Sequence, residues 1–368
     1  MKGWLLNIKT DYNNEVFDLL TKSIKLKPNF NKAWIELGEC YFKKGELKLA
    51  LNAFDQVLKQ NPNDKKALRN ASVMTRSLQC TGEEKKRNIL KSIDLAKKAI
   101  ACDLNDGDSW AVLANAYLTL LFMSKRTDHI TLVKNCKSAY QKALIDPKVE
   151  TKADVLFNYA LILQFDEDFE EALNCLLRAH RYDFEWSELE LRKNYLTTFF
   201  CEICQKLAFA SGLKAKNLNS MIENIKHHED KLLNRYANSE EMFNGNVKKL
   251  CQLSEGENDC LFLCKVLSYT SDSHNVFLCS VLNAIDSTGR NVALFIYDII
   301  PQKGPKPGDL VLIIRPFLKN HQIKFENKEY NFQAIKIINP MQEIYVNNKR
   351  LSMDCFSIPI VNVILKSD

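Results

Sequence analysis

The chain has 368 residues, of which 46% are hydrophobic and 26% charged, as is usual for a soluble globular protein of two or three domains. No apolar run approaches the roughly 18 residues of a membrane helix, and the first residues lack the pattern of a signal peptide. The sequence therefore predicts a cytoplasmic protein, or a nuclear one, with no membrane partner. A net charge of +6 argues against a nucleic-acid-binding surface over the whole chain.

The first clear element in chain order is a helical repeat of about 34 residues that begins at Asn31. Its small residues, Gly38 and Ala50, stand where two helices would approach closely, and Pro62 would end the second helix. Larger apolar residues would fill the space between the helices. The repeat markers are Ala33, Trp34, Leu37, Gly38, Tyr41, Gly45, Ala50, Phe54 and Pro62. They fit the tetratricopeptide template and predict a helix–turn–helix pair.

The repeat pattern continues on both sides of this pair. Before it stands a repeat whose first helix is nearly absent, so we expect the given sequence to begin within a repeat. After it, a long divergent repeat opens at Lys65, the pattern restarts at Trp110 and at Ala153, and a last helix begins after Trp186. Each repeat buries its apolar face against its neighbours. Residues 1–205 are therefore predicted to form an α-helical tetratricopeptide-repeat superhelix with a concave groove.

From about residue 256 the pattern changes to short β-branched and aromatic runs bounded by turns. The predicted strands are Cys260–Thr270, Asn275–Asp286, Asn291–Ile296, Asp309–Arg315 and Tyr330–Ile338. They favour a small all-β OB-like barrel over residues 256–368, with a generic β-sandwich as the alternative. We expect its aromatic side chains in the core, and we predict no nucleic-acid binding by the barrel. The aromatic residues concerned are Phe277, Phe295, Tyr297, Phe317 and Phe325.

A basic helical linker is predicted over residues 206–255, between the two domains. Its basic side chains include Lys214, Lys216, Lys226, His227, His228, Lys231 and Arg235. Two interpretations stay open. The linker is either a solvated helix with flexible chain, or a contact for a polyanion such as ribosomal RNA, from which clustered lysines release counterions.

Motifs of catalysis and cofactor binding are not found in the sequence. It contains no Gly-rich phosphate loop, no His-Glu-x-x-His, no Gly-x-Ser-x-Gly and no kinase signature. The Cys201-Glu202-Ile203-Cys204 segment has the spacing of a metal or redox motif, but no second pair accompanies it, which favours core packing. We therefore predict a protein that is not an enzyme and needs no cofactor or metal.

Polar residues fall at positions where the first helix of each tetratricopeptide pair faces the groove. Asp154 and Glu188 occupy the same position of adjacent repeats, so two carboxylates are predicted side by side, suited to an arginine or to an N-terminal amine. Arg76 falls where it could clamp a carboxylate. The groove asparagines could bind both N–H and C=O of an extended peptide: Asn70, Asn115 and Asn158. The pattern favours a short peptide with a basic and an acidic side chain; the alternative is a merely solvated face.

These residues resemble a known family over essentially the whole chain, that of tetratricopeptide repeat protein five (Strap), the tubulin autoregulation factor. The segments that carry the resemblance are Ala33–Gly45 (AWIELGECYFKKG), Asn70–Leu78 (NASVMTRSL), Ser109–Leu120 (SWAVLANAYLTL), Leu213–Met221 (LKAKNLNSM) and Asn327–Phe332 (NKEYNF). The family carries additional N-terminal helices, and this chain is expected to start within a repeat.

The resemblance implies a non-catalytic adaptor that recognises the nascent N-terminal Met-Arg-Glu peptide of tubulin at the ribosome. It then recruits an adaptor linked to a deadenylase complex, so that tubulin messages decay. The family's peptide-contacting arginine matches Arg76, and its acidic pair matches Asp154 and Glu188. Two lysines that touch ribosomal RNA near the exit tunnel match Lys214 and Lys216.

Two other functions remain as alternatives. The family is also described as a stress-responsive nuclear transcriptional coactivator, a scaffold that binds an acetyltransferase. A chaperone cofactor that clamps a C-terminal carboxylate is a third reading. Such a clamp needs several basic groove positions, and Asp154 and Glu188 count against it.

Overall fold

The computed structural model describes residues 12–123, 129–208, 215–236, 246–270, 279–300 and 303–356. By contact, the chain divides into two compact units, and α11 (Phe169–Tyr182) contributes to both. The first unit holds the chain up to Asp166 together with Arg178–Glu185, and the second holds Glu167–Leu177 and Trp186–Pro359. This grouping does not test the domain boundaries predicted at residues 205 and 255, which stay predictions.

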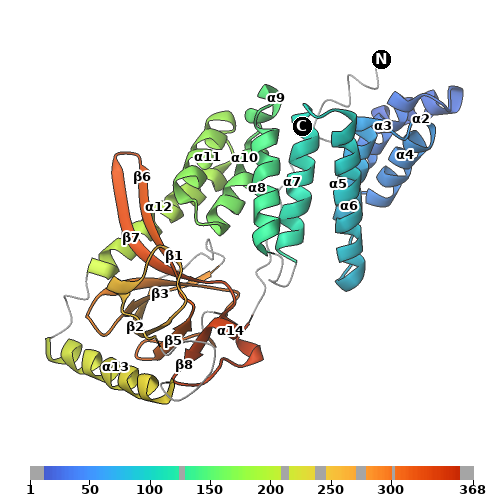
Figure 1. Cartoon of the computed structure of the whole chain (residues 1–368). Coiled ribbons are helices and arrows are strands. Elements are labelled where there is room, and N and C mark those ends of the chain that lie inside the picture. Colours follow the sequence, from blue (N-terminus) through green and yellow to red (C-terminus); the bar gives the residue numbers. More distant parts are fainter. Residues whose placement is uncertain are drawn as a thin grey trace. The chain divides into compact units, whose positions relative to one another are not determined.

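The first unit is a row of antiparallel helix pairs (Figure 1). Each helix packs against the next, and the first helices of successive pairs, α3, α5, α7 and α10, also contact one another in turn. This arrangement confirms the predicted tetratricopeptide stack. Its helices are α2 (Asn14–Leu26), α3 (Asn31–Lys43), α4 (Leu47–Gln60), α5 (Lys65–Ser77), α6 (Gly82–Cys102), α7 (Gly107–Leu121), α8 (His129–Ala143), the short α9 (Pro147–Glu150) and α10 (Ala153–Phe165).

Small residues permit the close approach of helices α3 and α4. A Cβ added to Gly38 would lie 2.5 Å from Cε1 of the buried Phe54 ring, and Ala50 is completely buried in the same cluster. Tryptophans tie two of the first helices, α3 and α7, to the turn before each helix. The Trp34 indole N–H donates to the Pro28 carbonyl at 2.8 Å, and Trp110 does the same to Leu104 at 2.9 Å. The repeat markers therefore play the packing roles that the sequence predicts.

The second unit contains one curled sheet of eight strands in the order β1-β6-β7-β4-β3-β2-β5-β8. All pairings are antiparallel except that of β4 with β7. A single curled sheet fits the OB-like prediction and not the β-sandwich. Its strands are β1 (Gly256–Glu257), β2 (Leu261–Tyr269), β3 (Cys279–Ile285), β4 (Asn291–Tyr297), β5 (Leu310–Ile314), β6 (Phe317–Phe325), β7 (Lys328–Ile337) and β8 (Ile344–Val346).

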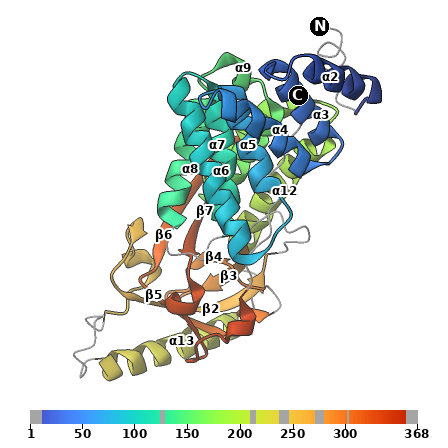
Figure 2. The same cartoon turned by 90° about the vertical axis from the view of Figure 1, so that its right-hand side faces the viewer.

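Two long helices pack on this sheet. Helix α12 (Ser187–Ala208) contacts β7, β4 and β3, and α13 (Ala215–Tyr236) lies along β2, as both views show (Figure 2). Of the aromatic residues predicted in the core, Phe295, Tyr297 and Phe325 are buried, whereas Phe317 is 39% exposed and Phe277 lies outside the described residues. None of the helices that the structure describes is long and apolar enough to cross a membrane.

Glu167, in the turn between α10 and α11, is a buried carboxylate of the second unit, at 2% exposed. Tyr297 donates a hydrogen bond to its Oε1 at 2.8 Å, and Lys336 Nζ lies 3.3 Å from the same atom. His321 Nε2 is 3.4 Å from Oε2, and Lys319 donates to the main-chain carbonyl at 3.0 Å. Four side chains from β4, β6 and β7 thus surround this one residue.

Candidate peptide-binding groove

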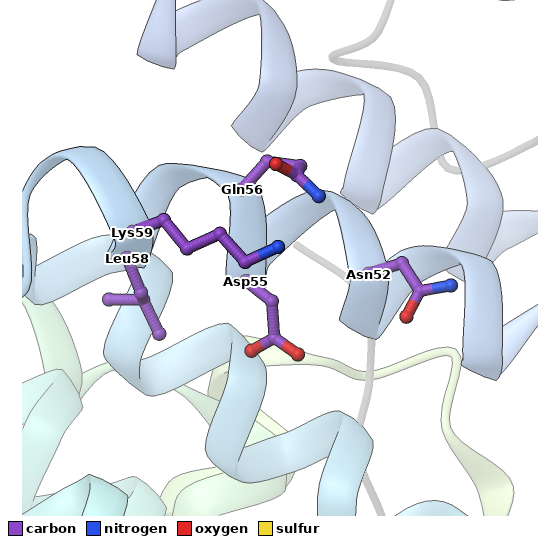
Figure 3. Close-up of a pocket in the computed structure, with 5 residues that line it drawn as sticks. All are labelled: Asn52, Asp55, Gln56, Leu58 and Lys59. Atoms are coloured by element: carbon purple, nitrogen blue, oxygen red, sulfur yellow. The ribbon is translucent and has the colours of Figure 1, made fainter.

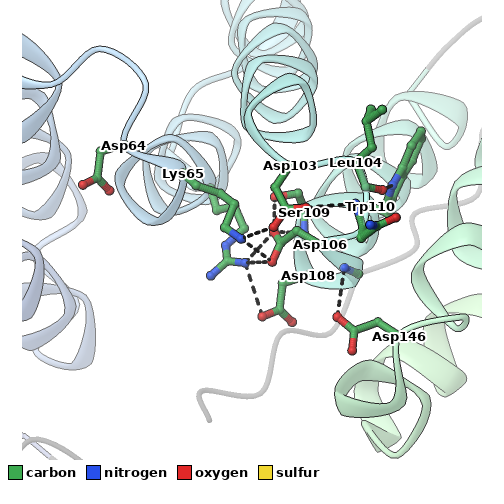
Figure 4. Close-up of polar contacts among 12 residues, drawn as sticks. Asp64, Lys65, Asp103, Leu104, Asp106, Asp108, Ser109, Trp110 and Asp146 are labelled. Carbon is green, nitrogen blue, oxygen red and sulfur yellow. Dashed lines mark hydrogen bonds and ion pairs between the residues drawn. The ribbon is translucent and has the colours of Figure 1, made fainter.

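Several charged side chains on the first helices of the repeats pair with a neighbouring helix or with the turn before it. Arg69, on α5, lies 2.7 Å from Asp106 and 3.3 Å from Asp108, at the start of α7. Lys65 contacts Asp103 at 2.8 Å and Asp106 at 3.2 Å, so the two cations share one acidic turn (Figure 4). These cations already have carboxylate partners, and a ligand would gain little from them.

The same lateral pairing joins α3 and α5. Lys66 Nζ lies 2.9 Å from Glu39 and 3.5 Å from Glu36. Burial would lower the pKa of Lys66, but the two carboxylates outweigh it and raise that pKa. Asn70, predicted to contact a peptide, donates from its amide nitrogen to Glu39 at 3.1 Å. One of its predicted binding groups is therefore engaged within the protein.

Arg76 differs from these cations. It is 4% exposed, and neither of its terminal guanidinium nitrogens has a hydrogen-bond partner among the described residues. Burial lowers the pKa of Arg76 to about 10, although Tyr140 opposes the shift, so the side chain stays charged at neutral pH. Lys85 donates to the Arg76 carbonyl at 2.6 Å and fixes the last turn of α5. The structure holds a positive charge ready for an acceptor that the described residues do not supply.

Two of the predicted asparagines are buried in the first helices that follow. Asn115, on α7, is 3% exposed and accepts a hydrogen bond from the Tyr140 hydroxyl at 2.5 Å. Asn158, on α10, is also buried. The ring of Tyr140 lies 5.4 Å from that of Tyr159. Both side chains are therefore buried, and they do not lie on a freely solvated face.

The predicted acidic pair is divided between the two units. Asp154, at the start of α10, is half-buried, and its charge helps to raise the pKa of Tyr140. Glu188, at the start of α12, is 48% exposed in its side chain and lies 3.8 Å from Arg192 one helical turn later. Asp154 belongs to the first unit and Glu188 to the second, so the expectation that the two carboxylates lie side by side stays a prediction.

The predicted ribosome contacts fall largely outside the structure. Lys214 lies outside the described residues, and Lys216 lies in the first turn of α13, with a side chain that is not described. Their role stays a prediction.

Sequence reasoning missed two groups of residues near the groove. The sequence pattern assigned no binding role to Tyr140, although its hydroxyl donates to Asn115. The pattern also assigned no role to Lys66, Glu36 and Glu39, although opposite charges somewhat less than one repeat length apart are a usable signal.

Other features add no chemistry to this site. An open pocket of about 330 Å³ is lined by residues of α4 alone: Asn52, Asp55, Gln56, Leu58 and Lys59 (Figure 3). Within the described ranges, no group of three or more His, Cys, Asp or Glu side chains could hold a metal ion.

Comparisons with known proteins agree with this architecture. A family model described as the Tetratricopeptide repeat protein 5 OB fold domain matches residues 244–359, and a tetratricopeptide repeat model matches residues 32–64. Over 356 residues, the chain is 33% identical to Tetratricopeptide repeat protein 5 of Mus musculus and 31% identical to that of Homo sapiens. Each alignment covers 95% of this chain and 79% of the relative.

Among solved structures, a thermophilic tetratricopeptide-repeat protein of Thermus thermophilus is 14% identical, with a TM-score of 0.41, over 50% of this chain and 89% of that one. The identity and coverage of the curated relatives decide the assignment. This chain belongs to the Tetratricopeptide repeat protein 5 family, and it is a repeat-containing adaptor.

Proposed function

We propose that this adaptor recognises the nascent N-terminal Met-Arg-Glu peptide of tubulin at the ribosome and triggers co-translational decay of tubulin messages. It would act without a cofactor, by joining the nascent chain to an adaptor of a deadenylase complex. The proposal rests on family membership together with the chemistry of the groove in the first unit.

The single observation that carries the proposal is the state of Arg76. A buried guanidinium without hydrogen bonds costs free energy, because it has left water and gained no acceptor in return. A peptide carboxylate would supply that acceptor in the bidentate geometry that arginine prefers. The neighbouring cations Arg69, Lys65 and Lys66 already have acidic partners. The acidic side chain of a ligand would therefore bind at Arg76 in preference to these three cations.

Polar residues of α7 and α10 would bind the remaining groups of the peptide. Asp154 offers a carboxylate to a basic side chain or an N-terminal amine, both of which Met-Arg-Glu carries. Asn115 would offer its amide to an extended main chain, whereas Asn158 is completely buried and stays a predicted contact. A ligand with a cation followed by an anion matches this order of groups.

The proposal is tested by titrating a fluorescent Met-Arg-Glu-Ile peptide with the purified chain, beside a scrambled peptide. Arg76→Ala and Asp154→Ala should each weaken binding about 10- to 150-fold, as expected for the loss of one charged hydrogen-bonded contact. Arg87→Ala, which removes an exposed arginine of α6, is the control and should bind as the wild type does. Equal affinity of all four proteins would refute the groove assignment.

The ribosome contact needs a separate experiment. Lys214→Glu with Lys216→Glu should abolish co-sedimentation with ribosomes that display nascent tubulin, while the affinity for free peptide stays unchanged. If co-sedimentation survives the double charge reversal, this part of the proposal is wrong. A nuclear coactivator scaffold, which needs no ribosome contact, would then be the better account.

A further inference from the structure

The hydroxyl of Tyr140 is a buried polar group in the groove region that the proposed function does not use. Tyr140 lies on α8, the second helix of its pair, and is completely buried. Its hydroxyl donates to Oδ1 of Asn115 at 2.5 Å, a contact between neutral groups. The structure pairs a second-helix residue with a first-helix residue that was predicted to face the peptide.

This hydrogen bond decides which end of the Asn115 amide is available. A tyrosine hydroxyl that donates must meet the amide oxygen, so the amide nitrogen is turned away from Tyr140. Within the part of the chain that the structure describes, the side-chain amide makes no other hydrogen bond. Asn115 then presents two N–H donors and has its oxygen already engaged. A backbone carbonyl is the group of an extended peptide that accepts such a bond.

The surroundings of Tyr140 keep its hydroxyl in place. Its ring packs 5.4 Å from the ring of Tyr159, and Cys136, one turn earlier on α8, donates to the Ala114 carbonyl at 3.4 Å. The charges of Arg76 and Asp154 both act on the Tyr140 hydroxyl. Tyr140 thus stands among the groups that the proposed function assigns to the peptide.

We infer that Tyr140 is a positioning residue, which fixes the Asn115 amide as a hydrogen-bond donor to a backbone carbonyl of the bound peptide. The inference rests on the proposed function, because it requires a peptide in the groove. The sequence-based expectation that Asn115 serves as donor and acceptor together stays a prediction, and this inference concerns its donor role.

The donor state of Tyr140 is stable over the physiological range. Burial, with a smaller contribution from Cys136, raises the pKa of Tyr140 well above its ordinary value. The hydroxyl therefore keeps its proton at neutral pH. The orientation of the Asn115 amide should not change with pH.

The test compares four proteins for binding of the fluorescent Met-Arg-Glu-Ile peptide: wild type, Tyr140→Phe, Asn115→Ala and the double variant. Tyr140→Phe keeps the packed ring and removes only the hydroxyl, so we expect about a fivefold weaker affinity, the value of one neutral hydrogen bond. The double variant should bind no more weakly than Asn115→Ala alone, because Tyr140 acts only through Asn115. Tyr117→Phe, on the same helix as Asn115, is the control for loss of a tyrosine hydroxyl and should bind normally.

A second readout separates positioning from a merely structural role. Peptides with one backbone carbonyl at a time replaced by a thiocarbonyl carry a poorer acceptor at a known bond. One of these replacements should weaken binding to the wild type and leave the affinity of Asn115→Ala and Tyr140→Phe unchanged.

The outcomes are distinguishable. The inference is overturned if Tyr140→Phe binds as tightly as the wild type, if its loss adds fully to that of Asn115→Ala, or if no thiocarbonyl position distinguishes the variants. A folded wild-type chain that fails to bind the peptide would remove the proposed function itself, and this inference with it.

Discussion

Two buried charges, one in each unit, lie in opposite environments. Glu167 is surrounded by Tyr297, Lys336, His321 and Lys319. Arg76 has no hydrogen-bond partner for its terminal nitrogens among the described residues. A charge that its own protein pairs holds structure together, whereas a charge left without an acceptor costs stability and is retained for another purpose. The comparison indicates a structural role for the charge of Glu167 and a ligand-binding role for that of Arg76.

The electrostatics of the two groups agree with this difference. Burial alone would raise the pKa of Glu167, but Lys336, His321 and Lys319 outweigh it and lower the pKa to about 2. For Arg76, burial is the dominant effect and lowers the pKa to about 10. The charged form of Glu167 is thus favoured by its surroundings, and that of Arg76 is disfavoured by them.

The largest effect is expected from Glu167→Ala. The substitution leaves Lys336 and Tyr297 without their carboxylate partner, and it should lower the free energy of unfolding by about 3–5 kcal/mol. Urea denaturation of the whole chain measures it. Glu190→Ala, which removes an exposed carboxylate of α12, is the control and should change stability little. A loss below about 1 kcal/mol for Glu167→Ala would contradict the structural role.

Acid should weaken the same cluster. Since the pKa of Glu167 falls from 4.5 to about 2 on folding, its contribution is present above pH 4.5 and is lost as pH falls toward 2. The expected loss is about 3 kcal/mol. Burial also lowers the pKa of His321 from 6.5, so the stability gained from its neutral form begins to decline below that pH.

The measurement is urea denaturation of wild type and Glu167→Gln between pH 7 and pH 3 at constant ionic strength. The stability advantage of the wild type should shrink as the pH falls through 4.5, because glutamine does not titrate there. An advantage that stays constant over this range would show that folding does not lower the pKa of Glu167.

Two arginines of helix α5 allow a paired charge and one that is unpaired among the described residues to be compared within one unit. Arg69 is paired with Asp106 and Asp108, so Arg69→Met should lower the free energy of unfolding by about 1–2 kcal/mol. Arg76→Met removes a buried charge without hydrogen-bonded partners and should leave stability unchanged or raise it by about 1 kcal/mol. Thermal and urea unfolding of both variants check the two signs. Equal destabilisation would mean that Arg76 has a structural partner after all.

The smallest effect concerns packing without charge. Gly38→Ala would place a Cβ 2.5 Å from the Phe54 ring, and the overpacking should exceed the gain in helix propensity by about 1 kcal/mol. In a chain that carries Phe54→Leu, Gly38→Ala should cost less stability than it does in the wild type, because leucine leaves room for the methyl group. If Gly38→Ala stabilises the chain, the close approach of α3 and α4 is not a constraint.

The repeat stack could be predicted from the sequence because its signals are local and periodic. Gly38, Ala50 and Phe54 occupy template positions and pack where the template requires. The lateral ion pairs also have a signal, since Lys65 and Asp103 stand 38 residues apart and Asn70 and Glu39 stand 31 apart, both near one repeat length. Placement of Arg76 and Asn115 on first helices followed from the same period.

The surroundings of Glu167, strand β6 and the Tyr140–Asn115 bond could not be predicted from the repeat period. The partners of Glu167 lie far along the chain, with Tyr297 at a separation of 130 residues and Lys319 at 152, and no period links them. Strand β6 was missed because its outward residues are polar, although the alternation of buried and exposed side chains along Phe317–Phe325 is a usable signal. The Tyr140–Asn115 bond depends on how two helices face each other, which spacing alone does not fix.

The most direct test of Arg76 as a receptor is a double-mutant cycle between protein and peptide. Wild type and Arg76→Met are each titrated calorimetrically with Met-Arg-Glu-Ile and Met-Arg-Gln-Ile. If Arg76 binds the peptide carboxylate, the wild type prefers the glutamate peptide by at least about tenfold, and Arg76→Met binds both peptides equally. If Arg76→Met retains the full preference for glutamate, the carboxylate is bound elsewhere and the central claim is wrong.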